Sequence, residues 1–184
     1  MKIKALTVAV AAILFTVAAN AQQNVNRVKP APSPTGFRAE FIANLDDVAS
    51  KYMDLAESIP ADKYGWRPVR GVRSISEVFV HIAASNYFLA TYAGAKAPAG
   101  LDGDMEKDIT AKAAVLLEMK KSFEFLRNHA RNLTDAQLES AVRMFDSKTT
   151  FRGVLLTIIS HIHEHLGQAI AYARMNGVVP PWSR

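Results

Sequence analysis

Three of the five histidines in the chain fall within five positions, in the segment SHIHEHLGQ at residues 160–168. On a helix, which turns by about 100° per residue, His161 and His165 lie one turn apart on the same face. His163 is rotated by about 200° from either of them and points to the other side. Two imidazoles at this spacing can bind one divalent ion together, so the sequence predicts a metal-binding pair at positions 161 and 165.

The helix face that carries this pair is otherwise mainly apolar, and its other members are Val154, Ile158, Gln168 and Tyr172. Imidazoles that face a core require partners for their ring nitrogens, and a shared metal ion supplies a partner to both. Core histidines that are hydrogen-bonded to their neighbours are the alternative interpretation. His81 favours the metal as a third ligand, because it is the lone basic residue in the apolar segment EVFVHIAASNYFL at residues 77–89.

Further residues are candidates for a second layer around the ion or for the wall of a pocket: Gln168, Glu77, Tyr172 and Trp66. Gln168 follows His165 by about one turn, where either a second-layer partner or an ordinary surface residue would fit. Glu77 lies one turn before His81 and could accept a hydrogen bond from it, although a helix-capping role explains this glutamate equally well. Trp66 either lines the site or closes the end of the helical domain.

Other metal motifs are excluded by their spacing. The zincin motif H-E-x-x-H fails because His163-Glu164 is followed at position 167 by glycine, which cannot bind a metal. The di-iron motif of ferritin-like bundles also fails, because no glutamate is followed by a histidine three positions later. His129 lies between two arginines near the end of its helix and is predicted to be a solvated charge or a charge at the helix C-terminus, not a ligand.

Apolar residues that recur every three or four positions predict an all-α fold with four long helices. The first helix ends at Pro60, Ser74 and Glu77 form a capping box for the second, and Thr149 or Thr150 caps the last. The helices are expected over residues 34–59, 74–92, 108–133 and 150–175, with one short extra helix at 134–142. Residues 143–150 are the one weak strand candidate. Four long helices and a short one predict a helical bundle.

The N-terminal region is predicted to be a cleavable signal peptide, residues 1–21, followed by a flexible linker, residues 22–34. Two lysines precede an apolar stretch of roughly 14 residues, too short to span a bilayer. A small-x-small sequence ending at Ala21 then provides the cleavage site. Cleavage leaves 184 − 21 = 163 residues with a net charge of 5 − 2 = +3. We therefore expect a periplasmic or secreted protein that does not remain in the membrane.

The composition limits the other function classes. The chain has no cysteine, so disulfides, thiolate metal sites and a lipid-anchored N-terminal cysteine are excluded. It also lacks a run of lysines and arginines interleaved with aromatic residues, so no nucleic-acid partner is expected. The domain, residues 35–182, must therefore be stabilised by packing of a core of its own.

Two segments resemble the signatures of the DinB superfamily. The segment YGWRPVRGVRSISEVFVHIAASNYFL is similar to the first signature, in which a W-x-P loop leads into a capped helix with a metal-binding histidine. The segment SHIHEHLGQAIAYARMNGVVPP is similar to the second, an H-x-x-x-H on the last helix followed by Gly-Gln, Tyr, Arg and a Pro-Pro loop. The resemblance extends over roughly residues 35–182, nearly the whole predicted domain.

The resemblance implies a four-helix bundle with a long crossover connection and one divalent metal ion bound by His81, His161 and His165. It also implies a homodimer, since family members are often dimers, and several members are thiol-dependent transferases or isomerases. The chain departs from the family pattern at Glu164, where a histidine is common, and at Leu166, where a basic residue is usual. These departures leave the ligands intact and concern the contacts to a substrate.

Two hypotheses about function follow. The first is an enzyme that acts on a small-molecule substrate. Imidazole ligands suit Zn²⁺, Ni²⁺, Fe²⁺ and Cu²⁺, and such an ion could support a metal-dependent hydrolase or a thiol-type transferase. The alternative is a non-catalytic, stress-associated metal-binding bundle that acts through dimerisation. An enzyme requires an open position at the metal and a cavity beside it, whereas a structural site is closed. Apolar residues on the far side of the last helix offer a surface for a dimer: Leu156, Ile159 and Ile170.

Overall fold

The structure is a computed structural model that describes residues 36–99 and 104–183. The predicted signal peptide and the predicted linker lie outside the described residues. Four long helices dominate the described part: α2 (Gly36–Ser58), α3 (Ile75–Thr91), α5 (Lys112–Asn132) and α7 (Phe151–Met175). Shorter elements connect and follow them: η1 (Ala61–Lys63), α4 (Met105–Asp108), α6 (Asp135–Leu138), β1 (Ala141–Met144), β2 (Ser147–Thr150) and η2 (Pro181–Ser183).

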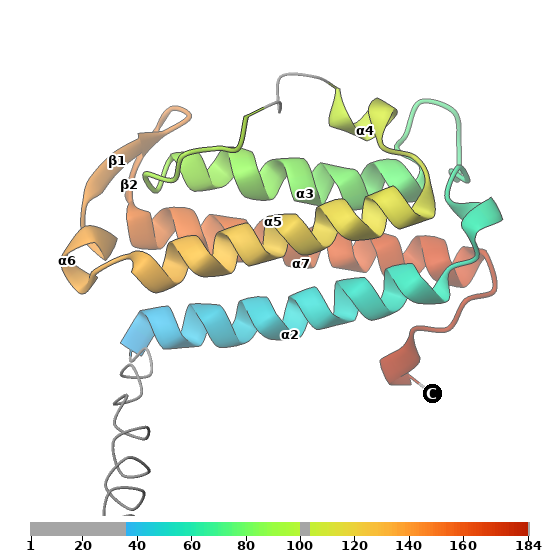
Figure 1. The fold of residues 1–184 in the computed structure, drawn as a ribbon, viewed down its shortest axis with the longest axis horizontal. Helices are drawn as coiled ribbons and strands as arrows, with labels where there is room; N and C mark the ends of the chain where they lie inside the picture. Colours follow the sequence, from blue (N-terminus) through green and yellow to red (C-terminus); the bar gives the residue numbers. More distant parts are fainter. Residues whose placement is uncertain (1–35, 100–103, 184) are drawn as a thin grey trace, which may run out of the picture. The chain divides into compact units, whose positions relative to one another are not determined.

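The four long helices form a bundle, as predicted (Figure 1). Helix α2 packs against α5 and α7, and helix α3 packs against the same two helices, so α2 and α3 lie at opposite corners. The connection from α3 to α5 is a long crossover that carries α4 back over the outer side of α3. This topology brings α3 and α7, the two helices with the candidate ligands, into direct contact.

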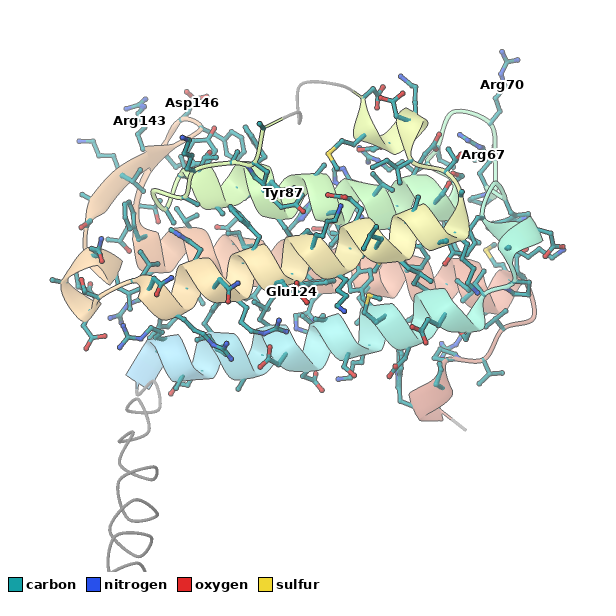
Figure 2. All side chains as sticks on the ribbon, viewed as in Figure 1. Arg67, Arg70, Tyr87, Glu124, Arg143 and Asp146 are labelled. Carbon is teal, nitrogen blue, oxygen red and sulfur yellow. The ribbon has the colours of Figure 1, made fainter. Side chains whose placement is uncertain are left out.

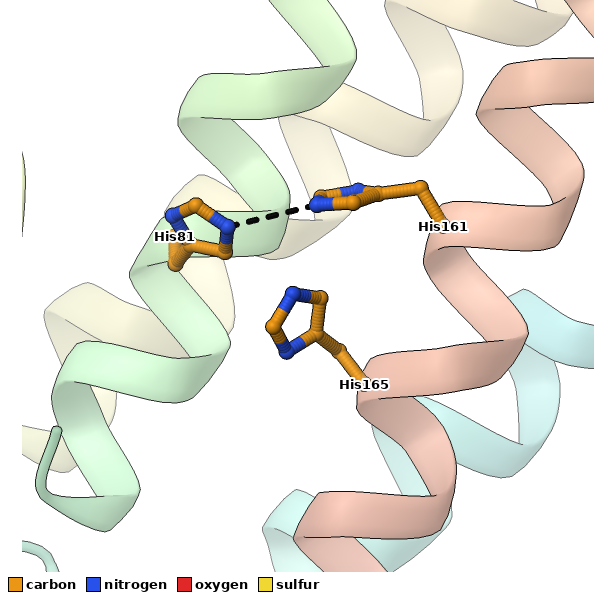
Figure 3. Close-up of side chains that lie close together, drawn as sticks. All are labelled: His81, His161 and His165. Atoms are coloured by element: carbon orange, nitrogen blue, oxygen red, sulfur yellow. Dashed lines mark hydrogen bonds between the residues drawn. The ribbon is translucent and has the colours of Figure 1, made fainter. Parts of the chain in front are cut away.

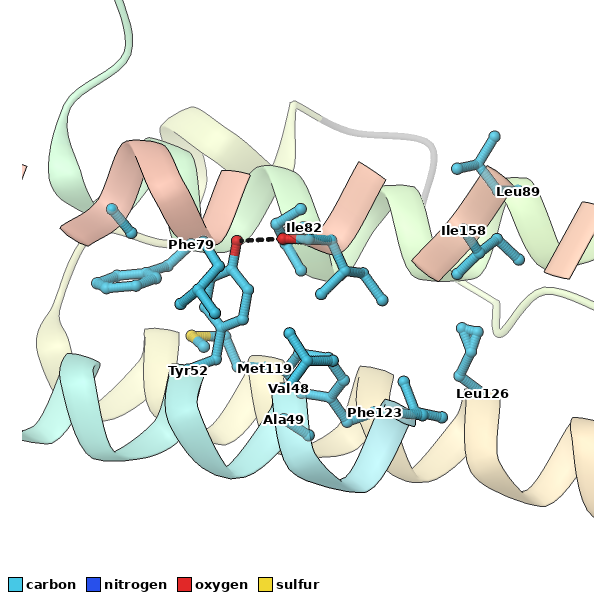
Figure 4. Close-up of a cluster of buried hydrophobic side chains, with 14 of the residues drawn as sticks. Val48, Ala49, Tyr52, Phe79, Ile82, Leu89, Met119, Phe123, Leu126 and Ile158 are labelled. Carbon is cyan, nitrogen blue, oxygen red and sulfur yellow. Dashed lines mark hydrogen bonds between the residues drawn. The ribbon is translucent and has the colours of Figure 1, made fainter. Parts of the chain in front are cut away.

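The core between the helices is closely packed and mainly aliphatic and aromatic (Figure 4). Tyr52 is fully buried at its centre, with its ring edge-on to Phe79 and 5.9 Å from the ring of Phe123. Its hydroxyl donates to the backbone oxygen of Ile162 at 3.1 Å, so the one polar atom of this ring has a partner. This contact fixes α2 against α7 close to the histidines.

The predicted helix caps are present. Ser74 and Glu77 form a capping box at the start of α3, and the Thr150 side chain accepts from the backbone of Gly153 at the start of α7. The structure also has a second capping box at α6, formed by Thr134 and Gln137. These caps satisfy backbone donors that have no partner within the helix and thereby fix where each helix begins. Helix α3 therefore begins one residue after Ser74, which sets the position of every residue on its outer face.

Two local predictions were wrong. The third long helix begins at Lys112 instead of near residue 108, because Ile109 and Ala111 have extended backbones that separate it from the short helix α4. The short helix α6 ends at Leu138 instead of near residue 142, and the weak strand candidate at 143–150 is confirmed as part of a β-hairpin over residues 141–150. Its turn residues are Phe145 and Asp146, and Phe145 has a φ of 50°. A turn without glycine or asparagine carries little hairpin signal in the sequence.

No helix among residues 36–99 and 104–183 combines the length and the apolar character needed to cross a membrane.

Candidate metal centre

The three predicted ligands meet between helices α3 and α7 (Figure 3). His81 comes from α3, and His161 and His165 come from successive turns of α7. One ligand atom from each residue can be chosen so that all three lie within 4.8 Å of one another. The Nε2 atoms of His81 and His161 are 3.3 Å apart, and the His165 ring lies 4.7 Å and 4.6 Å from these two rings. The structure therefore places three imidazoles around a common point.

The neighbouring histidines lie elsewhere. His163 is exposed on the outer side of α7, as the helix geometry requires, and takes no part in the cluster. His129 is half-buried, and its Nε2 atom donates to the backbone oxygen of Ala93 at 3.0 Å. Burial lowers the pKa of His129 and outweighs this hydrogen bond. The prediction of a charge at His129 was therefore wrong; it is a neutral ring that holds the end of α3 against α5.

Two of the three ligands have an acceptor on the ring nitrogen that faces away from the cluster. The Nδ1 atom of His81 lies 2.8 Å from Oε1 of Glu106, and the Nδ1 atom of His165 lies 2.7 Å from Oε1 of Gln168. Because a carboxylate or amide oxygen can only accept, each Nδ1 carries the proton. The lone pair of each ring is then on Nε2 and points into the cluster, which is the form that binds a metal.

Glu106 is itself held in place by Arg73. The guanidinium of Arg73 donates to both carboxylate oxygens of Glu106, at 2.6 Å and 3.1 Å. Burial alone would raise the pKa of Glu106, but the hydrogen bonds from Arg73 and His81 outweigh it and hold the pKa below its ordinary value. Glu106 is therefore ionised at neutral pH, and its charge favours a protonated Nδ1 on His81.

Two histidines of the cluster, His161 and His81, favour the neutral state. Burial, followed by the neighbouring rings of His165 and His81, lowers the pKa of His161 to about 4. The pKa of His81 is also lowered, chiefly by burial, although Glu106 opposes the shift. In the described part of the chain the Nδ1 atom of His161 is buried and has no hydrogen-bond partner. Neutral imidazoles are the metal-binding form, so these three donors fit a borderline divalent ion such as Zn²⁺, Ni²⁺ or Fe²⁺.

A polar cleft of about 770 Å³ lies beside the histidines. It is lined by Arg67, Gly71, Val72, Arg73, Glu77, Asp104, Glu106, Lys107 and Gln168. Glu106 and Gln168 both line this cleft and hydrogen-bond His81 and His165, so the cleft adjoins the cluster through these two residues. Its volume is in the range of small-molecule binding sites. The arrangement thus combines three metal-type donors with space for a second molecule.

The residues predicted to surround the ion take different positions. Gln168 bridges the site to the end of the bundle, because its Nε2 atom donates to the hydroxyl of Tyr172 at 3.1 Å. The Tyr172 ring in turn packs edge-on against Trp66, with 5.5 Å between ring centroids. Trp66 is therefore linked to His165 through Tyr172 and Gln168. Glu77 does not reach His81; it closes the capping box and pairs with Arg67 at 3.1 Å.

Glu106 and Arg73 are the functional candidates that the sequence alone did not single out. Glu106 precedes the third long helix and is separated from its partner His81 by 25 positions and a loop. The spacing of residues in the sequence can suggest a hydrogen-bond partner for His81 that lies one turn away on the same helix, such as Glu77. It cannot suggest a partner that lies in the crossover connection. The signal that remains is weak, because Glu106 is one of four carboxylates in this connection, beside Asp102, Asp104 and Asp108, and their spacing does not single it out.

The comparisons with known proteins agree with this fold. The family model of the DinB superfamily matches residues 44–169. A DinB-like protein from Bacillus cereus ATCC 10987 has a TM-score of 0.69 and 16% identity, with 77% of this chain and 93% of that chain covered. A DinB-like protein from Bacillus subtilis, YjoA, has a TM-score of 0.58 and 21% identity, with 75% and 92% covered.

A third similar structure, a conserved protein from Enterococcus faecalis, has a TM-score of 0.60 and 12% identity, with 77% of this chain and 97% of that chain covered. Among curated proteins no sequence matches the chain. The structural likeness shows the fold, and the family model spans well over half of the sequence, including all three clustered histidines. The chain therefore belongs to the DinB superfamily.

Proposed function

We propose that the protein binds one divalent metal ion through the Nε2 atoms of His81, His161 and His165 and acts on a small molecule as a metal-dependent hydrolase or transferase. The observation that supports this most is the convergence of three imidazoles, two of which carry a proton on the outer nitrogen and donate it to a fixed acceptor. Three uncharged ligands leave the charge of the ion undiminished. A divalent ion in such a site supplies Lewis acidity and a nucleophile at neutral pH.

The surrounding residues hold the site in shape. Glu106 and Gln168 orient the two rings on which they act, and Arg73 orients Glu106. The cleft beside the histidines supports the enzyme hypothesis over a non-catalytic brace between α3 and α7, because a purely structural metal site has no need of an adjoining cavity. Reaction at this position would take place between the ion and the residues of the cleft.

Two properties of the protein are further proposals. Export to the periplasm or the medium rests on the signal-peptide pattern of residues 1–21. A homodimer through the outer face of α7 is supported by Leu156, whose surface is 51% exposed, and by the half-buried Ile159 and Ile170 nearby on the same helix. Light scattering on the purified domain would report the dimer, and a Leu156→Glu variant should shift it to a monomer.

Metal content tests the proposal. Protein purified without a histidine tag should contain one equivalent of divalent metal by elemental analysis, and His161→Ala should lose it. His163→Ala is the matched control, because this histidine lies on the same helix but points to solvent. Equal metal content in wild type and His161→Ala would refute the metal site. Activity screening of the metal-loaded protein on esters, lactones, amides and thiol conjugates would then separate hydrolase from transferase.

A further inference from the structure

The outer face of α3 continues from the metal site into a groove. Ala84, Phe88 and Thr91 follow His81 at steps of three, four and three residues, which places all four on one side of the helix. The groove, of about 340 Å³, is lined by Ala84, Phe88, Thr91, Ala97, Asp104, Met105 and Glu106. We call it the α3 groove. It reaches Glu106, the residue that hydrogen-bonds Nδ1 of His81, so one end of the groove lies next to the histidine cluster.

The walls of the α3 groove are mainly apolar except at this end. The methyl group of Ala84 is small and half-buried and leaves space above the helix, while Met105 of α4 forms the opposite wall. The two carboxylates, Asp104 and Glu106, also line the polar cleft, so the groove and the cleft meet there. A molecule whose polar group lies at the metal can therefore extend an apolar portion along α3.

An exposed aromatic cluster lies at the far end of the groove. Phe88 is 52% exposed and Phe145 is 59% exposed, and their ring centroids are 6.3 Å apart. Tyr92 completes the cluster, with its ring 5.4 Å from that of Phe145. Phe145, in the turn of the hairpin, has a positive φ. Bulky residues adopt this backbone conformation rarely, and the cases that occur cluster at functional sites. The cluster therefore lengthens the apolar surface away from the metal site.

The hairpin and the loop before α3 lie at opposite ends of this surface (Figure 2). Figure 2 shows Arg67 and Arg70 near the start of α3, and Arg143 and Asp146 beyond its end at the hairpin. The polar groups of the cleft are thus concentrated at the metal end of α3, and the apolar surface runs from there towards the hairpin. Such a division of polar and apolar walls is typical of a site for a molecule with one polar end.

The charged side chains of the cleft are paired with one another. Arg67 pairs with Glu77, Arg73 with Glu106 and Lys107 with Asp104. These three cations and three carboxylates cancel, so the side chains of the cleft offer no unpaired charge to a head group. The carbonyl oxygen of a neutral compound can approach the proposed ion without breaking any of these pairs.

From the continuity of groove and metal site we infer the substrate class: a neutral ester or amide of a carboxylic acid with a linear or aromatic apolar tail, whose tail lies in the α3 groove. The inference rests on the proposed metal site, because the metal positions the polar end. Hydrolysis of such a compound adds water across the acyl C–O or C–N bond and yields a carboxylic acid and an alcohol or amine. The length of the groove should determine which tail lengths bind best, whether or not the bound compound is hydrolysed.

Binding of n-alkyl hydroxamic acids to the zinc-loaded full chain tests the inference without turnover. The hydroxamate group binds zinc in every member of the series, so differences between members report the tail alone. Calorimetry from acetohydroxamic to decanohydroxamic acid should show affinity rising by about 2- to 4-fold per methylene, the lower value for a tail buried on one side only. The rise should level off when the tail reaches the aromatic cluster. Affinity that is independent of tail length would overturn the inference.

Two variants locate the effect in the groove. Ala84→Trp fills the groove and should abolish the dependence on tail length, while zinc content and the affinity for acetohydroxamic acid stay unchanged. Ala113→Trp, an exposed alanine on α5, is the matched control and should behave as wild type. Phe88→Ser alters an exposed side chain, and it should weaken only the longest members. Unchanged tail-length dependence in both groove variants would overturn the inference even if wild type shows the rise.

Three further outcomes distinguish a tail-binding groove from an interface between copies and from the metal site. If Phe88→Ser converts a dimer into a monomer and leaves the tail-length dependence unchanged, the aromatic cluster is an interface between copies and the inference fails. If His161→Ala lowers the affinity of every member by the same factor and preserves the increment per methylene, both the metal site and the groove are supported. If wild type binds no zinc but binds longer tails more tightly, the metal proposal fails and the assignment of the groove stands.

Discussion

Replacing Glu106 by alanine tests whether a residue of the crossover connection determines the affinity of the proposed metal site. The carboxylate accepts from Nδ1 of His81 at 2.8 Å and is itself clamped by two hydrogen bonds from Arg73. Without it, the His81 ring can rotate, and the proton can move to Nε2, the atom that faces the other ligands. Both changes weaken metal binding, because the metal-free protein no longer holds the His81 ring and its Nε2 lone pair in the orientation that binds the ion.

The magnitude follows from the kind of contact that is lost. Removal of a hydrogen-bond partner behind a metal-binding histidine lowers metal affinity by about 10- to 100-fold, or about 1.4–2.8 kcal/mol. We expect the upper part of this range for Glu106→Ala, because the lost partner is a charged carboxylate. Glu106→Gln keeps an oxygen that can accept from His81 but loses the charge and the paired geometry with Arg73, so its loss should be intermediate.

The assay is a competition titration of zinc against a chelator of known affinity, at fixed pH and ionic strength. Glu164→Gln is the matched control, since this exposed glutamate is adjacent to a ligand but accepts no hydrogen bond from one in the described structure. Melting curves of the metal-free proteins should show that Glu106→Ala still folds. Zinc affinity equal to that of wild type in folded Glu106→Ala would refute the role assigned to Glu106.

Two other predictions concern the stability of the metal-free protein. Tyr52→Phe removes the hydrogen bond to the backbone oxygen of Ile162 and should lower the free energy of unfolding by about 1 kcal/mol, seen as a fall in Tm of about 2–4 °C; an unchanged Tm would contradict it. The pKa of His161 is about 4 in the folded state and about 6.5 when unfolded, so the unfolded state binds more protons between these values. Stability should therefore fall as the pH decreases from 6.5 through 4, and the fall should be shallower in metal-free His161→Ala; identical denaturation profiles across this window would contradict it.

The sequence was sufficient to predict the bundle and the residues that meet in the cluster. Helical periodicity separates His161 and His165 from His163 because the angle between positions is fixed by the helix itself. His81 required a different kind of signal, a basic residue alone on an apolar helix. That signal gives no distance, and the convergence of α3 and α7 became visible only in the folded bundle.

The crossover connection and the hairpin could not be predicted in the same way. The backbone becomes extended at Ile109, and this separates α4 from α5, although the residues on both sides favour helix. The sequence pattern does not predict this break in the helix, because the break depends on the tertiary packing of α4 against α3. The hairpin turn at Phe145 and Asp146 is likewise held by the contacts of Phe145 with other aromatic rings, which lie far away in the sequence.

The short helix α4 connects the two proposals. Its first two residues act on different parts of the site: Met105 forms a wall of the α3 groove, and Glu106 holds His81. A helix of four residues is not stable by itself, so its position depends on packing against α3 and on the clamp between Arg73 and Glu106. Changes that displace α4 should therefore alter metal affinity and tail-length preference together. Changes on α7, which supplies ligands but no wall of the groove, should alter metal affinity alone.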